Sequence, residues 1–225
     1  CSFGAYFSSQ SATLPAANNT GNLTTVTDAI VHSIIYDPRT KRATGVRVIN
    51  AITKERKEYS GRVIFLCAST LGTTQILLNS TSEQFQNGFA NSSNALGHYL
   101  MDHVKGMGAT GDFPGMMDKY YFGRRPNGIY VPRFKNVNAQ SSEFLRGYGY
   151  QGAARRSGWR DAIDKQGFGV QYKNEFKTPG PWTFRMSAYG EMLPRFENHV
   201  SLHQTKKDKW GMPLLHVSCA HGDNE

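Results

Sequence analysis

Residues 62–79 constrain the fold more than any other stretch, because an unbroken apolar run is followed there by a helical pattern. Residues 63–66 are Val, Ile, Phe and Leu, with no polar residue between them, which is typical of a strand covered on both faces. The apolar residues that follow fall near helical spacing, and Ser69 or Thr70 can accept a backbone N–H group at a helix start. The stretch therefore predicts a buried strand, a tight turn and a helix.

The predicted turn consists of the small residues Cys67, Ala68 and Ser69. We expect Cys67 to be a buried small hydrophobic residue, since it continues the apolar run. A strand end without bulk that opens into a helix N-terminus lets a flat or anionic ligand approach the main chain. Ordinary packing of a helix on a strand is the alternative interpretation of the same residues.

The composition is that of a folded chain rather than a disordered one. The 225 residues include 13 Phe, 11 Tyr and 3 Trp, and only 19% are charged. The net charge of +9 comes from short basic clusters that no helix or repeat aligns, so solvated faces are favoured over nucleic-acid binding. Three cysteines without a CxxC pair indicate neither a disulfide framework nor a zinc site. No stretch has the length of a transmembrane helix, so we expect a soluble protein of the cytoplasm or periplasm.

Short strands are predicted on both sides of residues 62–79. Four segments between turn-rich stretches predict a small antiparallel meander, at residues 23–26, 29–36, 45–50 and 57–59. From about Lys105 glycine and aromatic residues become frequent, which favours a broad antiparallel sheet in the second half. Its expected strands are residues 129–134, 144–151, 167–172, 182–191 and 199–202, and a short helix is expected at 161–165.

His103 is the histidine whose sequence context most suggests chemistry. It follows an apolar pair and has a carboxylate neighbour, Asp102, so it could act as a ligand or a general base. Adjacent residues of a strand point to opposite faces, so their being neighbours in sequence does not bring the Asp102 and His103 side chains together. A packed, hydrogen-bonded histidine is the alternative interpretation.

A series of short motifs runs through the chain. They are Cys1-x-x-Gly4-Ala5, residues 8–11, residues 14–17 (LPAA), Thr20-Gly21-Asn22-Leu23, Ala43-Thr44-Gly45-Val46, residues 63–69, and Leu96-Gly97-x-x-Leu100-Met101-Asp102-His103. In combination they resemble the glucose-methanol-choline (GMC) oxidoreductases, flavoenzymes that bind FAD on a doubly wound domain and oxidise alcohols or sugars over a sheet-floored substrate domain. In the second half, residues 189–194, 197–202 and 209–213 resemble the pyranose-oxidase-like branch.

The resemblance implies an α+β or α/β fold. Residues 1–104 would form part of a doubly wound FAD-binding domain with a β-meander, and residues 105–225 part of a substrate-binding domain on a largely antiparallel sheet. It implies hydride transfer from a CH–OH group to FAD, with a sugar or glycoside as the expected substrate, and no metal. The implied FAD contacts are Val31, Cys67, Ala68, Ser69, Leu96, Gly97, Asp102 and His103, and the implied substrate contacts are Gln171 and Arg185.

Two features of that family do not occur in the sequence. One is a strand followed by GxGxxG and an acidic residue, which places the FAD diphosphate on a helix N-terminus. The other is the C-terminal segment whose His, with a second His or Asn, takes the proton from the substrate hydroxyl. We therefore expect an internal fragment of the enzyme that holds no catalytic residue, binds FAD weakly or not at all by itself, and has no turnover.

A non-enzymatic, β-rich carbohydrate-binding or structural domain is the alternative from another functional class. It accounts for the glycine-rich and aromatic residues 105–225 about as well. It does not account for the apolar run and the small-residue helix start at residues 63–79.

Overall fold

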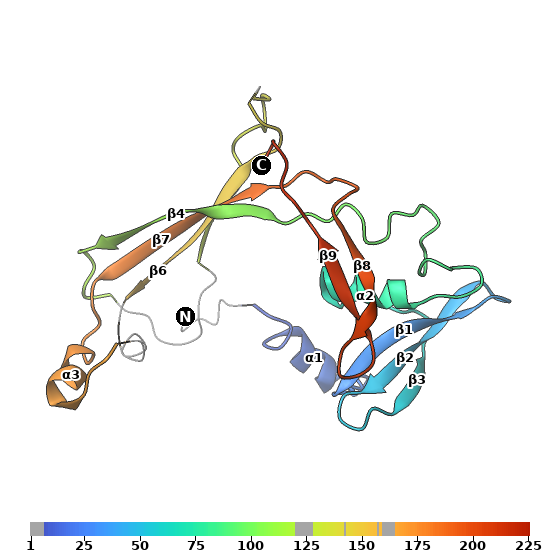
Figure 1. Cartoon of the computed structure of the whole chain (residues 1–225). Helices are drawn as coiled ribbons and strands as arrows, with labels where there is room; N and C mark the ends of the chain where they lie inside the picture. The colour runs from blue at the N-terminus through green and yellow to red at the C-terminus, as the bar shows by residue number, and fades with distance from the viewer. Residues whose placement is uncertain (1–6, 120–127, 142, 157, 159–164) are drawn as a thin grey trace. The chain divides into compact units, whose positions relative to one another are not determined.

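The computed structural model describes residues 7–119, 128–141, 143–156, 158 and 165–225, and the chain divides into two compact units (Figure 1). Unit 1 comprises residues 1–23, 102–192 and 223–225, and unit 2 comprises residues 24–101 and 193–222. Helices and antiparallel sheets both occur, which confirms the expectation of a mixed, sheet-rich chain. The predicted division at residue 104 concerns functional domains and stays a prediction.

The predicted meander is confirmed as an antiparallel sheet of unit 2 with the strand order β1-β2-β3. Its strands are β1 (Ala29–Asp37), β2 (Arg42–Asn50) and β3 (Arg56–Ser60). The register pairs Val31 with Val48 and Ile34 with Val46, and β1 is irregular between Val31 and Ser33. Residues 23–26, for which a strand was also predicted, lie outside any strand.

The segment that precedes the next helix differs from the prediction. The helix, α2 (Ser69–Asn79), is present, but residues 63–66 form no strand. Val63 is 70% exposed and Phe65 is 84% exposed. A strand becomes buried on both faces only when neighbouring strands pair with it and other elements cover it, and no described strand pairs with this segment. The prediction of a buried strand at this position is therefore wrong for this structure.

Helix α2 contacts both the meander, through β1, and the hairpin formed by β8 (His199–Lys207) and β9 (Pro213–Ser218). The Ser80 hydroxyl accepts a hydrogen bond from the backbone N–H of Ile34 (2.8 Å) and donates one to the carbonyl of Ile76 (2.6 Å). On the hairpin side, Gln75 Nε2 donates to the carbonyl of Pro213 (2.8 Å). These bonds hold the helix against both sheets.

The turn of the hairpin also reaches the meander. Trp210 Nε1 donates a hydrogen bond to the carbonyl of Ala51 at 2.9 Å. The apolar core of unit 2 draws on the meander, the helix and the hairpin, and its buried residues are Ile34, Val48, Ile49, Ile76, Val200 and Met212. Unit 2 is thus built around α2 by segments distant in sequence.

Unit 1 contains a broad antiparallel sheet, as predicted for the second half, with the order β4-β7-β6-β5. Residues 199–202 were expected in this sheet, but they belong to β8 and pair with β9 in unit 2. Its strands are β4 (His103–Phe113), β5 (Ile129–Val131), β6 (Tyr148–Arg156) and β7 (Trp182–Glu191). The register places Arg185 between Thr110 of β4 and Ala153 of β6. Successive residues of a strand point to opposite faces, so this register determines which side chains share a face.

Two helices lie where the sequence predicted a strand or no element. Residues 167–172 were expected to be a strand, but α3 (Gly169–Glu175) lies there. The rings of Tyr172 and Phe176, four residues apart, meet edge to face at 5.1 Å, which is a helical spacing. Helix α1 (Thr13–Asn19) was not predicted. The short helix expected at 161–165 lies largely outside the described residues.

In the part of the chain that the structure describes, no helix is both long and apolar enough to span a membrane.

Candidate functional site

The small residues at the start of α2 form an exposed turn. Ala68 is the N-cap residue, and no hydrogen bond from its side chain caps the helix. The expected cap by Ser69 or Thr70 is therefore wrong, because Ser69 is already the first helical residue, with φ of +64°. Cys67 is exposed rather than buried, since the segment before it is uncovered. Small side chains leave the first turn of the helix open to a ligand.

Gly97 lies in a loop that is fixed to β8. Its carbonyl accepts a hydrogen bond from the N–H of Val200 (2.8 Å), and the next bond runs from Leu100 N–H to the Asn198 carbonyl (2.9 Å). Gly97 has φ of +86°, and a Cβ atom there would overlap the Val200 carbonyl oxygen. Only glycine suits this position, because both the conformation and the close approach exclude a side chain. The half-buried Leu96 precedes it.

The helix start and this loop line one cavity of about 250 Å³ within unit 2. Thr70 and Thr74 contribute from α2, and Gly97, with residues 98–101, contributes from the loop. Val200 of β8 completes the lining. Of the predicted FAD contacts, Gly97 lines this cavity. Thr70 directly follows the predicted contacts Cys67, Ala68 and Ser69, which do not line it.

Val31 lies on β1, which forms an edge of the meander among the described strands. It is half-buried and pairs with Val48 of β2. Ile34 on the same strand uses its backbone N–H to bond Ser80 rather than another strand. The backbone of β1 can therefore bond groups outside its own sheet, as a contact to an adenine ring would require.

Asp102 and His103 lie in unit 1, where His103 begins β4. The Asp102 carboxylate accepts a hydrogen bond from the backbone N–H of His103 at 2.7 Å. The His103 ring meets Tyr189 of β7 edge to face, at 5.6 Å between centroids. The carboxylate therefore bonds the histidine's main chain, and the exposed imidazole faces an aromatic neighbour instead.

Of the two predicted substrate contacts, Arg185 lies on β7 and Gln171 lies on α3, and both are exposed. The register and the alternation of strand residues put Arg185 on the same face of the sheet as Ser187 and Tyr189. We call this the polar face, and its side chains are those of Lys105, Thr110, Gln151, Arg185, Ser187 and Tyr189. His103 pairs with Glu191 at the end of β7, six residues along the strand from Arg185, which corresponds to about 20 Å.

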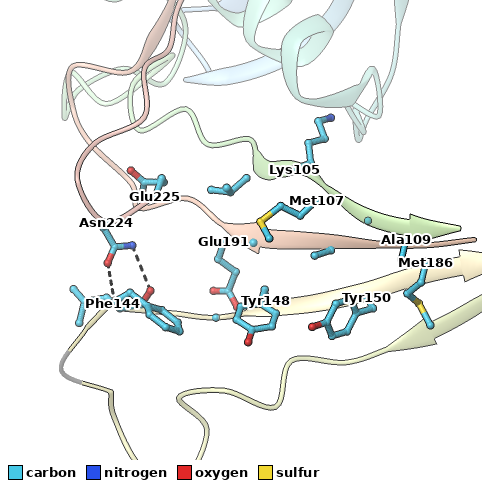
Figure 2. Close-up of a pocket in the computed structure, with 16 residues that line it drawn as sticks. Lys105, Met107, Ala109, Phe144, Tyr148, Tyr150, Met186, Glu191, Asn224 and Glu225 are labelled. Carbon is cyan, nitrogen blue, oxygen red and sulfur yellow. Dashed lines mark hydrogen bonds between the residues drawn. The ribbon is translucent and has the colours of Figure 1, made fainter.

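The opposite face of the same sheet carries an aromatic cavity of about 640 Å³ that the sequence did not predict (Figure 2). Tyr148 and Tyr150 of β6 lie next to one another along the strand, with ring centroids 5.9 Å apart. Met107 of β4 and Met186 of β7 add apolar surface. The Tyr-x-Tyr spacing indicates that the two tyrosines share one face of a strand. It did not predict the cavity, because the residues of other strands on that face are known only from the register.

A charged side chain and a polar one lie at the edge of this aromatic cavity. Glu191, which lines it, forms an ion pair with Arg133 at 2.8 Å. Asn224 also lines it, and its Oδ1 accepts a hydrogen bond from the N–H of Leu145 at 2.7 Å. Among the described residues no group of three His, Cys, Asp or Glu side chains could hold a metal ion.

His32 of β1 has a shifted pKa. Partial burial lowers the pKa of its imidazole first, and the positive charges of Arg56 and Arg47 lower it further. Its Nδ1 atom lies 3.0 Å from the Ser33 hydroxyl. Lys57 and Glu58 are the other charged residues around the cavity that His32 lines.

Residues 1–105 match the GMC oxidoreductase family model. The matched part includes the meander, α2 and the Gly97 loop. The chain is also 27% identical over 205 residues to a 2-methyl-1,2-propanediol dehydrogenase of Mycolicibacterium austroafricanum. That alignment covers 88% of this chain and 37% of the dehydrogenase, so the chain spans little more than a third of that relative's length. The family model and the relative's name both denote oxidoreductases.

We predict that Gly97→Ala destabilises unit 2 far more than a glycine replacement that meets no neighbour. Gly21→Ala is the matched control, because Gly21 also has a positive φ (+72°) but no atom within 4 Å of a built Cβ. The left-handed backbone conformation should lower the free energy of unfolding of Gly21→Ala by about 1 kcal/mol. The overlap with Val200 should lower that of Gly97→Ala by about 2 kcal/mol more. Urea unfolding of both variants measures the difference, and equal losses would show that the Gly97–Val200 contact is not needed.

We predict that the free energy of unfolding decreases as the pH falls below about 6.5, the usual range of histidine. A lowered pKa means that the unfolded chain binds the proton more readily than the folded chain, so acid favours unfolding. His32→Asn should reduce the dependence of the free energy of unfolding on pH. His216→Asn, on the exposed part of β9, should leave that dependence unchanged. Urea unfolding at several pH values between 5 and 8 tests this prediction. A pH dependence of stability that His32→Asn leaves unaffected would contradict it.

Proposed function

We propose that the protein containing these residues is an FAD-dependent oxidoreductase that acts on CH–OH groups. One observation supports this most directly: within the part that matches the GMC oxidoreductase model, the open start of α2 and the Gly97 loop line a common cavity. The name of the relative, a diol dehydrogenase, agrees with an alcohol donor.

The described residues fit the FAD that the family implies. The first two residues of α2, Ser69 and Thr70, are small and exposed, and no side chain caps the helix, so its first backbone N–H groups can face a ligand. We propose that residues 1–104 contribute to a doubly wound FAD-binding domain in which Val31, Cys67, Ala68, Ser69, Leu96, Gly97, Asp102 and His103 approach the cofactor. When bound, FAD would accept the hydride from the carbon that carries the hydroxyl group.

The polar face of the unit 1 sheet is the surface that we propose for the substrate. Hydroxyl-rich molecules require hydrogen-bonding groups, and this face carries the guanidinium of Arg185 and the hydroxyls of Ser187 and Tyr189. The substrate class proposed here is a sugar or glycoside, as in the pyranose-oxidase-like branch. Gln171 of α3 remains a proposed substrate contact.

A second candidate function is supported by the aromatic cavity on the other face. Aromatic rings stack on the C–H faces of sugars, so Tyr148 and Tyr150 would also suit a non-enzymatic carbohydrate-binding domain. This function does not explain the cavity at the start of α2.

The test uses the complete protein loaded with FAD. Addition of a sugar or a simple diol without oxygen should bleach the long-wavelength flavin absorbance. Arg185→Gln should raise KM for the sugar about tenfold, because a charge-assisted hydrogen bond is lost, while the amount of bound flavin is unchanged. Arg39→Gln is the matched control, since it removes a guanidinium from the exposed turn between β1 and β2, outside this sheet.

Each outcome of this test has a definite meaning. Absence of bleaching by any sugar or diol would overturn the proposed oxidation of CH–OH groups. If bleaching occurs but Tyr150→Ala raises KM whereas Arg185→Gln does not, the substrate lies on the aromatic face and the assignment to the polar face is wrong.

A further inference from the structure

A second cavity of unit 2, of about 520 Å³, is separate in its lining residues from the one at the start of α2. It lies where the meander meets the end of α2. We call it the cationic cavity, and the residues that matter to its chemistry are His32, Arg47, Arg56, Lys57, Glu58 and Asn79.

The charges around the cationic cavity do not balance. Glu58 forms an ion pair with Arg47 at 3.0 Å, which offsets one positive charge. Arg56 and Lys57 also line the cavity, and neither forms an ion pair with any described residue. The register places Lys57 on the opposite face of the meander from Arg47, Arg56 and Glu58, because Lys57 pairs with Val48 and Glu58 pairs with Arg47. The three side chains on the face of Arg47 therefore leave an excess of one positive charge, which favours an anionic ligand.

Asn79 gives independent evidence that a ligand with acceptor atoms is needed. It is the last residue of α2 and lines the cavity. Its Nδ2 atom is buried and has no hydrogen-bond partner among the described residues. A buried donor without a partner costs about 1–3 kcal/mol. An acceptor oxygen of a ligand would remove this penalty if the Asn79 side chain turns toward the cavity.

His32 gives the cavity a further hydrogen-bonding group. Its imidazole lies between the Ser33 hydroxyl, at 3.0 Å, and the positive charges of Arg56 and Arg47. Burial lowers the pKa of the ring first, and those two charges lower it further, which favours the neutral form of the imidazole.

We infer that the cationic cavity binds a phosphate group, either as free phosphate or as a phosphate monoester. The guanidinium of Arg56, with the amide of Asn79, supplies donors that a tetrahedral oxyanion with several acceptor oxygens can accept from. The inference does not rest on the proposed FAD site, because it uses residues of the meander and of the opposite end of α2.

The experiment is a titration of the 225-residue chain with inorganic phosphate and with AMP at constant ionic strength, since screening alone would mimic weak binding. NMR of the Asn79 side-chain amide follows the site, and calorimetry gives the affinity. We expect a saturable shift of the Asn79 signal with at least one of the two ligands. Arg56→Gln should weaken that binding about tenfold or more, while Arg39→Gln, in the exposed turn between β1 and β2, should not.

A saturable response to AMP alone would identify the ligand as a monoester, and a response to both would identify phosphate itself as sufficient. No saturation with either ligand, or binding that Arg56→Gln leaves unchanged, would overturn the inference. Competition by FAD for the same Asn79 signal would also overturn it, because the cavity would then belong to the flavin site. Calorimetry with Arg56→Lys, which keeps the charge but loses the planar fork of donors, gives the same test if Arg56→Gln does not fold.

Discussion

The packing of α2 against both β1 and β8 is the interaction on which the rest of unit 2 depends. Ser80 bonds the edge of β1 through Ile34, and Gln75 bonds the hairpin through Pro213, so one short helix joins segments distant in sequence. The same packing determines the candidate flavin site. The Gly97 loop is held to β8 beside the helix, which places it at the first turn of α2.

The elements that depend on local pattern were predicted well. The strands of the meander follow from short apolar runs between turn residues, and their antiparallel pairing needs only neighbouring segments. The broad sheet was predicted as a class, but its pairing of β4 with the distant β7 was not. The strand at residues 63–66 was wrong because burial is not a local property. Its apolar run indicates that a partner would cover it, but no described strand pairs with it, and Phe65 is exposed. Helix α3 was missed because Tyr172 and Phe176 have helical spacing that glycine and aromatic composition concealed.

The candidate site was predictable in its residue types more than in its geometry. Gly97 was identified through a motif, and the structure supplies the reason for glycine, which is the close approach of Val200. Which face of the sheet Arg185 occupies follows from its register with Thr110, which no local pattern in the sequence specifies. The buried amide of Asn79 could not be predicted at all, because an unpaired donor is defined by the absence of a partner in space.

The measurement that tests the central claim most directly is hydrogen–deuterium exchange of the complete protein with and without FAD. Two separate segments, the start of α2 and the Gly97 loop, should bind one cofactor, since both line one cavity. FAD should therefore slow exchange at residues 67–71 and at residues 96–101 together, with little change in β9 (Pro213–Ser218). Unchanged exchange at both segments, with FAD bound, would contradict the claim that these residues form part of the flavin site.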